Sequence, residues 1–270
     1  MEHFEQHRNL ESRERQKVEA YFSISNLVRR GRFVHPDGRE ETFDIAIMAG
    51  TTKEGKRRFQ AVGGGAKLSE TAVEELRTEY PSIRFREGEE ATDARFYIPI
   101  PHAAQVNPSS SEEEQAKETQ ALTTFVHEVM DRFVDPKAPV FTDTIEREIL
   151  EELTETKEGY EPVLTEAEAQ KIETSYVGAT SPIQWSKTTS GRSGSAAVYH
   201  RIFHLYDITI PEDLFNKLKN SERIRILSPE DIAAIRSSTQ KGNAAAELSD
   251  GSVVVENIFP DFHTNASRHL

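Results

Sequence analysis

Short runs of apolar residues, separated by polar turns, recur along most of this chain. Runs that are rich in aromatic and β-branched residues predict strands, and they fall at 21–35, 42–48, 58–62, 83–86, 94–100, 173–178, 182–188, 198–210 and 224–227. The segment His35-Pro36-Asp37-Gly38 is a strong turn signal. The first two strands should therefore form a hairpin or a meander.

Other segments repeat apolar residues at the spacing of a helix. Most of them follow a residue that commonly caps or starts a helix. These predicted helices are 70–79, one that starts within the polar stretch 107–114 and continues to about 133, 143–155, a short helix after Thr165, 212–219 and one beginning at Ser228-Pro229. Strands and helices are mixed along the chain without an internal repeat, which predicts an α+β fold with a layered, mixed sheet. The charged segment 1–20 is interpreted as an extension, 21–240 as the domain, and 241–270 as a tail that packs as an edge strand or stays mobile.

Composition limits the classes of function. The formal net charge is −13, which argues against a general binder of nucleic acid because such binding needs Lys and Arg to neutralise phosphates. A nucleotide held through a divalent metal is still compatible with an acidic protein. The chain has no Cys, no signal peptide and no run of the roughly 18–20 apolar residues that span a bilayer. We therefore expect a cytoplasmic protein without membrane or stable nucleic-acid partners.

The predicted helix 143–155, with Asp143 as its cap, carries the most suggestive chemistry. At about 100° per residue it has two faces. The apolar face carries Ile145, Ile149, Leu150 and Leu153, and the acidic face carries Glu148, Glu151, Glu152 and Glu155. Like charges one turn apart repel by a few tenths of a kcal/mol, whereas Mg²⁺ or Mn²⁺ would bind to such oxygen ligands and could activate water. Acidic helix faces are more often simply solvated, and that interpretation stays open.

The residues Arg147-Glu148-Ile149-Leu150-Glu151-Glu152 resemble the second half of the Nudix box, Arg-Glu-aliphatic-x-Glu-Glu-x-Gly-aliphatic. The resemblance implies that Glu151 and Glu152 are metal ligands, that Glu148 is a ligand or general base, and that Arg147 is a structural salt-bridge partner. It also implies a Nudix-like α/β/α sandwich with a mixed sheet and a helical insertion, at about 66–135, before the Nudix helix.

The surroundings of this motif both support the resemblance and depart from it. The strand at 58–65 resembles the Nudix strand that ends in glycines before the box. The family's upstream Gly and Glu would fall on Phe133 and Pro139, and the Gly after the Glu pair is Thr154. The chain also resembles a prokaryotic subgroup, the Nudix-like domains associated with second-messenger nucleotidyltransferase systems in antiviral defence, which have an Asp-x-Arg-Phe strand like that at 93–96.

Other residues are candidates for contact with a substrate. Gly64 and Gly65 could let backbone N–H groups approach a phosphate, although a strand-to-loop turn is the plainer explanation. Arg192 and Arg201 flank the loop and strand expected to line the pocket, and either could hold a diphosphate by bidentate contacts; a surface ion pair is the commoner role. Lesser candidates are Glu230 as an additional acid, and Trp185, Phe203 and Tyr206 as residues that stack on a base or belong to the core.

The favoured function is therefore Mg²⁺-dependent hydrolysis of a nucleoside diphosphate linked to another group, with a nucleotide-type small molecule as substrate. Two alternatives remain. One is a Nudix-like module that senses a nucleotide without cleaving it, which Pro139 and Thr154 motivate. The other is a protein-interaction domain in a prokaryotic defence or regulatory system. The particular nucleotide and the oligomeric state, with a homodimer among the options, do not follow from the sequence.

Overall fold

The computed structural model describes residues 19–85, 93–101, 104–105, 111–142, 144–157, 159–180, 183–189, 196–240 and 245–254, and of 183–189, 196–199 and 239–240 it describes the backbone alone. Several predictions lie outside the described residues. They concern the extension before residue 19, the cap at Asp143, the side chain of Trp185, the residue Arg192 and the tail beyond residue 254.

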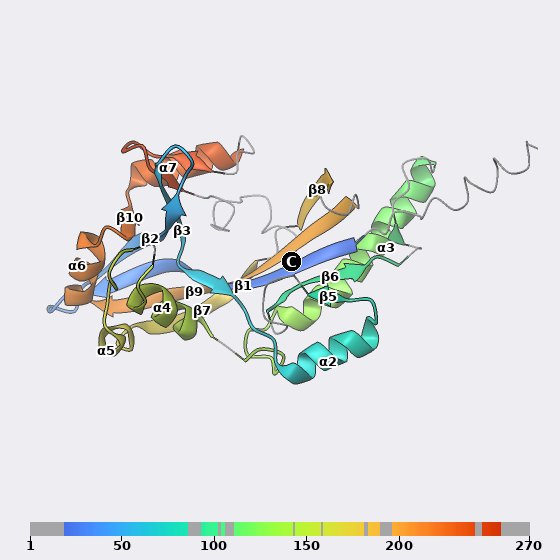
Figure 1. Ribbon diagram of the computed structural model, residues 1–270, viewed down its shortest axis with the longest axis horizontal. Helices are drawn as coiled ribbons and strands as arrows, with labels where there is room; N and C mark the ends of the chain where they lie inside the picture. Colours follow the sequence, from blue (N-terminus) through green and yellow to red (C-terminus); the bar gives the residue numbers. More distant parts are fainter. Residues whose placement is uncertain are drawn as a thin grey trace, which may run out of the picture.

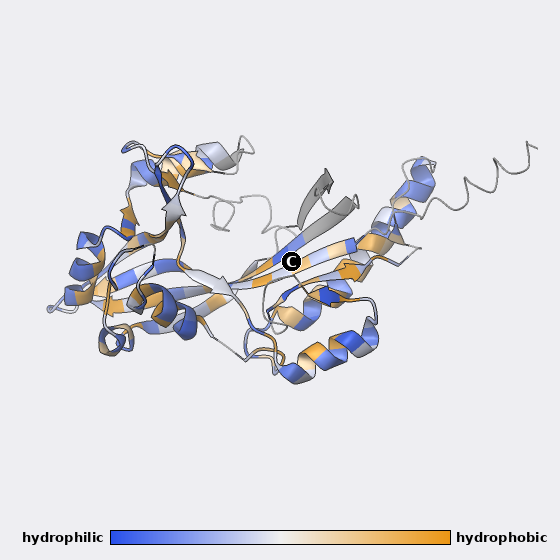
Figure 2. Ribbon diagram, in the orientation of Figure 1, coloured by the Kyte–Doolittle hydropathy of each residue, from blue (hydrophilic) through white to orange (hydrophobic). Residues whose placement is uncertain are grey.

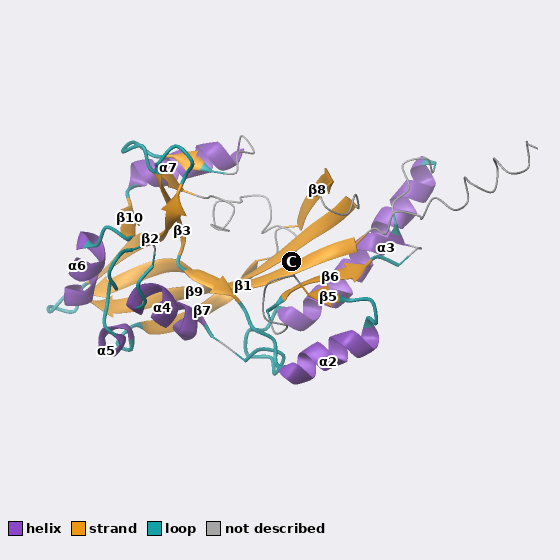
Figure 3. Ribbon diagram, in the orientation of Figure 1, coloured by secondary structure: helices purple, strands orange, loops and turns teal. Residues whose placement is uncertain are grey.

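The described strands join into one mixed sheet of 12 strands (Figure 3). They are β1 (Glu19–Val34), β2 (Glu40–Thr51), β3 (Arg57–Ala61), β4 (Gly63–Gly65), β5 (Arg84–Phe85), β6 (Arg95–Pro99), β7 (Glu173–Thr180), β8 (Ile183–Thr189), β9 (Ala196–Pro211), β10 (Ile224–Leu227), β11 (Ala246–Glu247) and β12 (Val253–Val254). The helices are α2 (Glu70–Glu79), α3 (Glu112–Met130), the 3₁₀ helix η2 (Asp131–Phe133), α4 (Ile145–Thr154), α5 (Glu166–Ala169), α6 (Glu212–Asn220) and α7 (Pro229–Gln240).

Strand β1 lies at the centre of the sheet and organises it. Along one edge it pairs in parallel with β9, from Glu19 opposite Ala197 to Val34 opposite Pro211. Its other edge is shared in turn by β6, β4 and β2, all antiparallel to it. Figure 1 shows β1 and β9 running together through the length of the sheet. The glycine strand β4 therefore fills the gap between two longer strands.

Helices cover both faces of this sheet, and side-chain alternation assigns each residue to one of them. The face that carries Phe22, Ile24 and Val28 packs against α2 and α3 in one half and against α4, α5 and α6 in the other. We call it the α4 face. The opposite face carries Leu27 and Leu205 and packs against α7; we call it the α7 face. Figure 2 shows hydrophobic and hydrophilic residues alternating along strands and helices.

Local sequence signals account for most helix boundaries. Ser69 accepts a hydrogen bond from the Ala72 N–H at the start of α2, as its sequence position predicts. A reciprocal capping box between Thr165 and Glu168 starts α5. Helix α4 begins later than predicted, with Thr144 at the N-cap position and no side-chain hydrogen bond there. The motif at 147–152 is nevertheless entirely helical.

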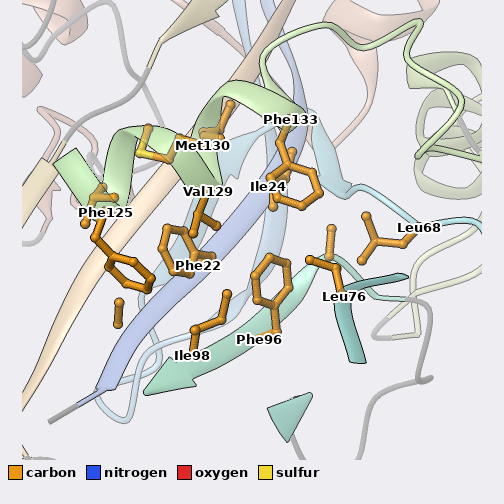
Figure 4. Packing of buried hydrophobic residues seen from close by; sticks show 14 of the residues in the cluster. Phe22, Ile24, Leu68, Leu76, Phe96, Ile98, Phe125, Val129, Met130 and Phe133 are labelled. Atoms are coloured by element: carbon orange, nitrogen blue, oxygen red, sulfur yellow. The ribbon is translucent and has the colours of Figure 1, made fainter. Parts of the chain in front are cut away.

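The α+β class is confirmed, and the stretch predicted as a helical insertion joins the main sheet. Strand β6 lies within 66–135 and pairs with β1 from Ser23 to Glu19. Its residues Phe96 and Ile98 share a core with Phe22 and with α3 (Figure 4). At the other end of the chain, Val253–Val254 form the strand β12 beside β3. Among the described helices, none has the length and apolar character that crossing a lipid bilayer would require.

The aromatic core between β1, β6 and η2 provides a test of this packing. Phe96 is fully buried, and its ring lies 5.5 Å from that of Phe22 and 5.6 Å from that of Phe133. We expect Phe96→Ala to lower the free energy of unfolding by about 3–5 kcal/mol, because it leaves a cavity in a packed core. Urea denaturation measures this. Val177→Ala, at a 43% exposed position, should change stability by less than about 0.5 kcal/mol, and equal losses would contradict the packing.

Candidate functional site

Helix α4 places two glutamates inside the molecule. Ile145, Ile149 and Leu153 pack into the core between the sheet and α5. Glu148 and Glu152 lie beside this apolar stripe, one turn apart, and each is only 6% exposed. An ionised carboxylate is costly to bury unless it is hydrogen-bonded or paired. The contacts of these two side chains therefore decide what this part of the molecule can do.

The two carboxylates lie against the glycine strand β4. The Gly63 N–H donates to Glu152 Oε2 at 3.0 Å. A Cβ added at Gly64 would lie 2.0 Å from Glu148 Oε2, so any side chain there would displace this carboxylate. At Gly63 a Cβ would lie 2.1 Å from the backbone oxygen of Asn26, and its φ of +133° also favours glycine. The glycines thus leave the space that the glutamates occupy.

Burial and neighbouring charges together set the protonation of Glu152. Arg147 donates to Glu148 and, at 2.6 Å, to Glu151 Oε1. The pKa of Glu152 is raised to about 7, chiefly by burial and to a smaller extent by the nearby charge of Glu148, although the Gly63 N–H and the cations Lys157 and Arg223 act to lower it. A carboxylate with a pKa near neutrality can take up or release a proton at the pH of a cell.

Arg223 fixes the C-terminal end of α4. It is 2% exposed, and its guanidinium donates to the backbone oxygens of Glu152 at 2.7 Å and Glu155 at 2.6 Å. These carbonyls belong to the last turn, where α4 offers them no donor of its own. Arg223 therefore holds the helix in position relative to the sheet. Nothing in the local sequence marks this role, which depends on a contact between distant segments.

A buried polar pair lies next to the glutamates on the α4 face. Asn26 of β1 is in register with Gly64, so its side chain points to the same side of the sheet as Glu148. His204 Nδ1 lies 3.2 Å from Asn26 Oδ1, and its Nε2 lies 2.7 Å from the backbone oxygen of Phe133. Asn26 Nδ2 is buried and has no hydrogen-bond partner among the described residues. Leaving such a donor unpaired costs about 1–3 kcal/mol, which favours a ligand acceptor nearby.

Asn26 stands out in the sequence as a polar residue within an apolar strand. The residue lies within the strand Tyr21-Phe22-Ser23-Ile24-Ser25-Asn26-Leu27-Val28, at a position where alternation requires an apolar side chain on the α4 face. A polar residue at such a core position indicates a specific partner or a functional site. By contrast, the involvement of Arg223 could not have been found in this way.

The structure brings only some of the predicted site residues together. Glu148 and Glu152 meet at Gly63 and Gly64, whereas Glu151 is turned toward Arg147 and is 43% exposed. Arg201 lies on the opposite, α7 face. It is in register with Ser23, whose side chain points away from the face that carries Asn26. Other candidates have ordinary positions: Glu230 is exposed, and Phe203 and Tyr206 are buried among core residues.

The two buried carboxylates could supply part of the ligand shell of a metal ion. Within the described ranges, no group of three or more His, Asp or Glu side chains is arranged to hold one. Mg²⁺ in nucleotide enzymes commonly takes one or two carboxylates and completes its shell with water and substrate phosphates. Glu148 and Glu152, both directed at the glycine strand, fit an ion that shares its ligands with a phosphorylated substrate.

A shallow groove of about 780 Å³ lies elsewhere, at the C-terminal end of α4, between residues 159–163 and α6. Its lining includes Asp213, Lys217 and Arg223 but neither of the buried glutamates.

Comparisons of the chain with protein-family models, with curated proteins and with solved structures found no match. The glutamate–glycine geometry is therefore the feature from which a function can be inferred.

A double-mutant cycle tests the contact between Gly64 and Glu148. Gly64→Ala should lower the free energy of unfolding by about 1–3 kcal/mol, because the new methyl group must displace the carboxylate. In a Glu148→Ala background the same change should cost much less, since the obstructing atoms are gone. Urea denaturation of the four proteins gives the coupling energy. A cost of Gly64→Ala that is the same in both backgrounds would disprove the contact.

The pKa of Glu152 predicts a pH dependence of stability. Between the ordinary value of 4.5 and the folded value of about 7, the folded state keeps a proton that the unfolded state has lost. Unfolding then releases a proton, so stability falls as the pH rises through this window, by up to about 3 kcal/mol, and is constant above it. Glu152→Gln removes this loss.

The measurement compares wild type and Glu152→Gln by urea denaturation from pH 4 to pH 8 in the presence of a chelator. The variant should gain stability relative to wild type as the pH rises, and Glu75→Gln, an exposed change on α2, should not. Parallel curves for wild type and Glu152→Gln would show that the pKa of Glu152 is not raised.

Proposed function

We propose that this protein is a Nudix-type, Mg²⁺-dependent hydrolase that cleaves a nucleoside diphosphate linked to another group. One observation carries the proposal. The segment that resembles the Nudix box forms a helix whose Glu148 and Glu152 are buried against a strand of glycines. A surface helix that was acidic only for solubility would direct these carboxylates into water.

Three further features support the proposal. The sheet is mixed and carries helices on both faces, which is compatible with a Nudix-like α/β/α sandwich. Arg147 pairs with Glu148 and Glu151, the structural role that the resemblance implies for it. Asn26 supplies a buried amide donor without a partner among the described residues, beside the same carboxylates.

The residues of the chain have distinct tasks in this proposal. Glu148 and Glu152 would hold Mg²⁺, with Glu151 as a further ligand, and the ion when bound supplies positive charge against the phosphates. Hydrolysis forms a bond from a water oxygen to phosphorus and breaks the P–O bond to the leaving group. The water loses a proton as this happens, and Glu148, in the alternative role of general base that the resemblance implies, would accept it. Arg223 keeps α4 in position, and the apolar core behind α4 excludes bulk water.

A nucleotide-sensing module without hydrolase activity is the second candidate. Glu151 is engaged by Arg147, and the described part of the chain holds no ready three-carboxylate group. Thr154 and Pro139 also replace residues of the Nudix box. Such a module, in a prokaryotic defence or regulatory system, would use the same glycines and Asn26 to bind a nucleotide and would release it unchanged.

The test is a hydrolase screen with nucleoside diphosphates linked to a sugar, to a second nucleotide or to a further phosphate, each with Mg²⁺ or Mn²⁺. We expect phosphate-ester or diphosphate cleavage that falls at least about 100-fold in Glu152→Gln and in Glu148→Gln, because each removes a group that holds metal or accepts the proton. Glu75→Gln, an exposed change on α2, should retain full activity.

The outcomes separate the two candidates. Turnover that depends on both glutamates supports the hydrolase. A ligand that raises the melting temperature of wild type and leaves the solution chemically unchanged supports the sensor, since binding to the folded state alone stabilises it. Neither turnover nor stabilisation by any nucleotide, with or without metal, would remove both candidates and favour a protein-interaction domain.

A further inference from the structure

A row of cationic residues crosses the other face of the sheet. Arg95 of β6, Ser23 of β1 and Arg201 of β9 are in register with one another, since Ser23 pairs with both arginines. Cross-strand neighbours in register point to the same side. All three residues therefore lie on the α7 face, where each is half-buried. The sheet separates this row from Glu148 and Glu152.

Arg201 is unusual among the interior arginines of this acidic chain. Arg29 makes two hydrogen bonds to Asp207, at 2.8 and 2.9 Å, and Arg225 is bound in the same way to Asp231. Arg201, in contrast, makes no ion pair or side-chain hydrogen bond with any residue in the described ranges. A guanidinium carries its charge at every physiological pH. A half-buried guanidinium without an acid partner indicates that an anion outside the described residues accounts for its position.

The glycine strand gives the second arginine its place. A Cβ added at Gly65 would lie 2.7 Å from a terminal nitrogen and 3.2 Å from the Cζ of Arg95. The guanidinium therefore lies directly over the backbone of β4, where only a glycine leaves room. Gly65 is also in register with Ser25, whose small side chain leaves space beside the Arg95 guanidinium. The row is consequently bordered on this side by small residues.

The two acids that β1 and β9 place on this face are each paired with an arginine. Glu19, near the start of β1, is paired with Arg84, and the Arg84 guanidinium stacks over Tyr97 at 5.0 Å. Tyr97 in turn lies against Tyr21, with ring centroids 4.7 Å apart. Toward the other end of the sheet, Asp207 is bound by Arg29. Neither acid is therefore available to Arg201, which keeps its positive charge.

We propose that Arg201, together with Arg95 and Ser23, forms a binding site for a phosphoryl or pyrophosphoryl group on the α7 face. Neighbouring strands lie about 4.8 Å apart, so the two arginines begin about 10 Å apart and can reach one anion from both sides. Guanidinium groups bind phosphate oxygens in a bidentate manner, and the Ser23 hydroxyl adds a donor between them. The site needs no metal and does not depend on the proposed hydrolase activity.

The experiment measures binding of inorganic pyrophosphate to the full chain by isothermal titration calorimetry, with a chelator present. We expect wild type to bind pyrophosphate, Arg201→Gln to bind it at least about tenfold more weakly, and Arg201→Lys to fall between them, because Lys keeps the charge but not the fork. Ser23→Ala should give a smaller loss. Glu152→Gln should bind like wild type, which separates this site from the hydrolase proposal.

Arg39→Gln is the matched control, because it removes an equal charge from an exposed arginine that pairs with Asp37 in a turn. The proposal is overturned if wild type does not bind pyrophosphate, or if Arg39→Gln weakens binding as much as Arg201→Gln does. Adenosine diphosphate serves as a second probe. Affinity equal to that of pyrophosphate would show recognition of the phosphoryl group alone, and higher affinity would assign the site to a nucleotide; both results support it.

Discussion

The parallel pairing of β1 with β9 is the constraint on which the rest of this structure depends. Each strand is 16 residues long, and their register decides which face of the sheet every side chain occupies. It places Asn26 and His204 together on the α4 face and Ser23 with Arg201 on the α7 face. A shift of β9 by one residue would turn His204 and Arg201 to the opposite faces and would separate both pairs, so this single pairing holds them together.

Charged side chains from other elements can lie against the backbone of β4, because its three glycines have no side chains to exclude them. Glu148 closes over Gly64 from one side, and Arg95 lies over Gly65 on the other. Adjacent residues of a strand point to opposite faces, so consecutive glycines clear space on both. Opposite charges are thereby placed over the two faces of one short strand.

Burying polar groups at this point reduces the stability of the fold. Burial raises the pKa of Glu152, and Asn26 keeps an amide nitrogen without a partner among the described residues. Arg223 offsets part of the cost, because it satisfies the last carbonyls of α4 and brings a positive charge near Glu152. Unfavourable features that are held in place by such support are characteristic of functional sites, and the apolar core around α4 is large enough to maintain them.

Hydrophobic periodicity and capping residues determined the strands, most helices and the α+β class, because these depend on neighbours a few positions apart; Ser69 and Thr165 are examples. The motif at 147–152 likewise predicted a helix with acids on one side. Only the tertiary structure decided that Glu148 and Glu152 face glycines more than 80 positions earlier, and that Arg201 lies across the sheet from them. Those contacts join distant segments, and they follow from strand register and packing, which no local pattern contains.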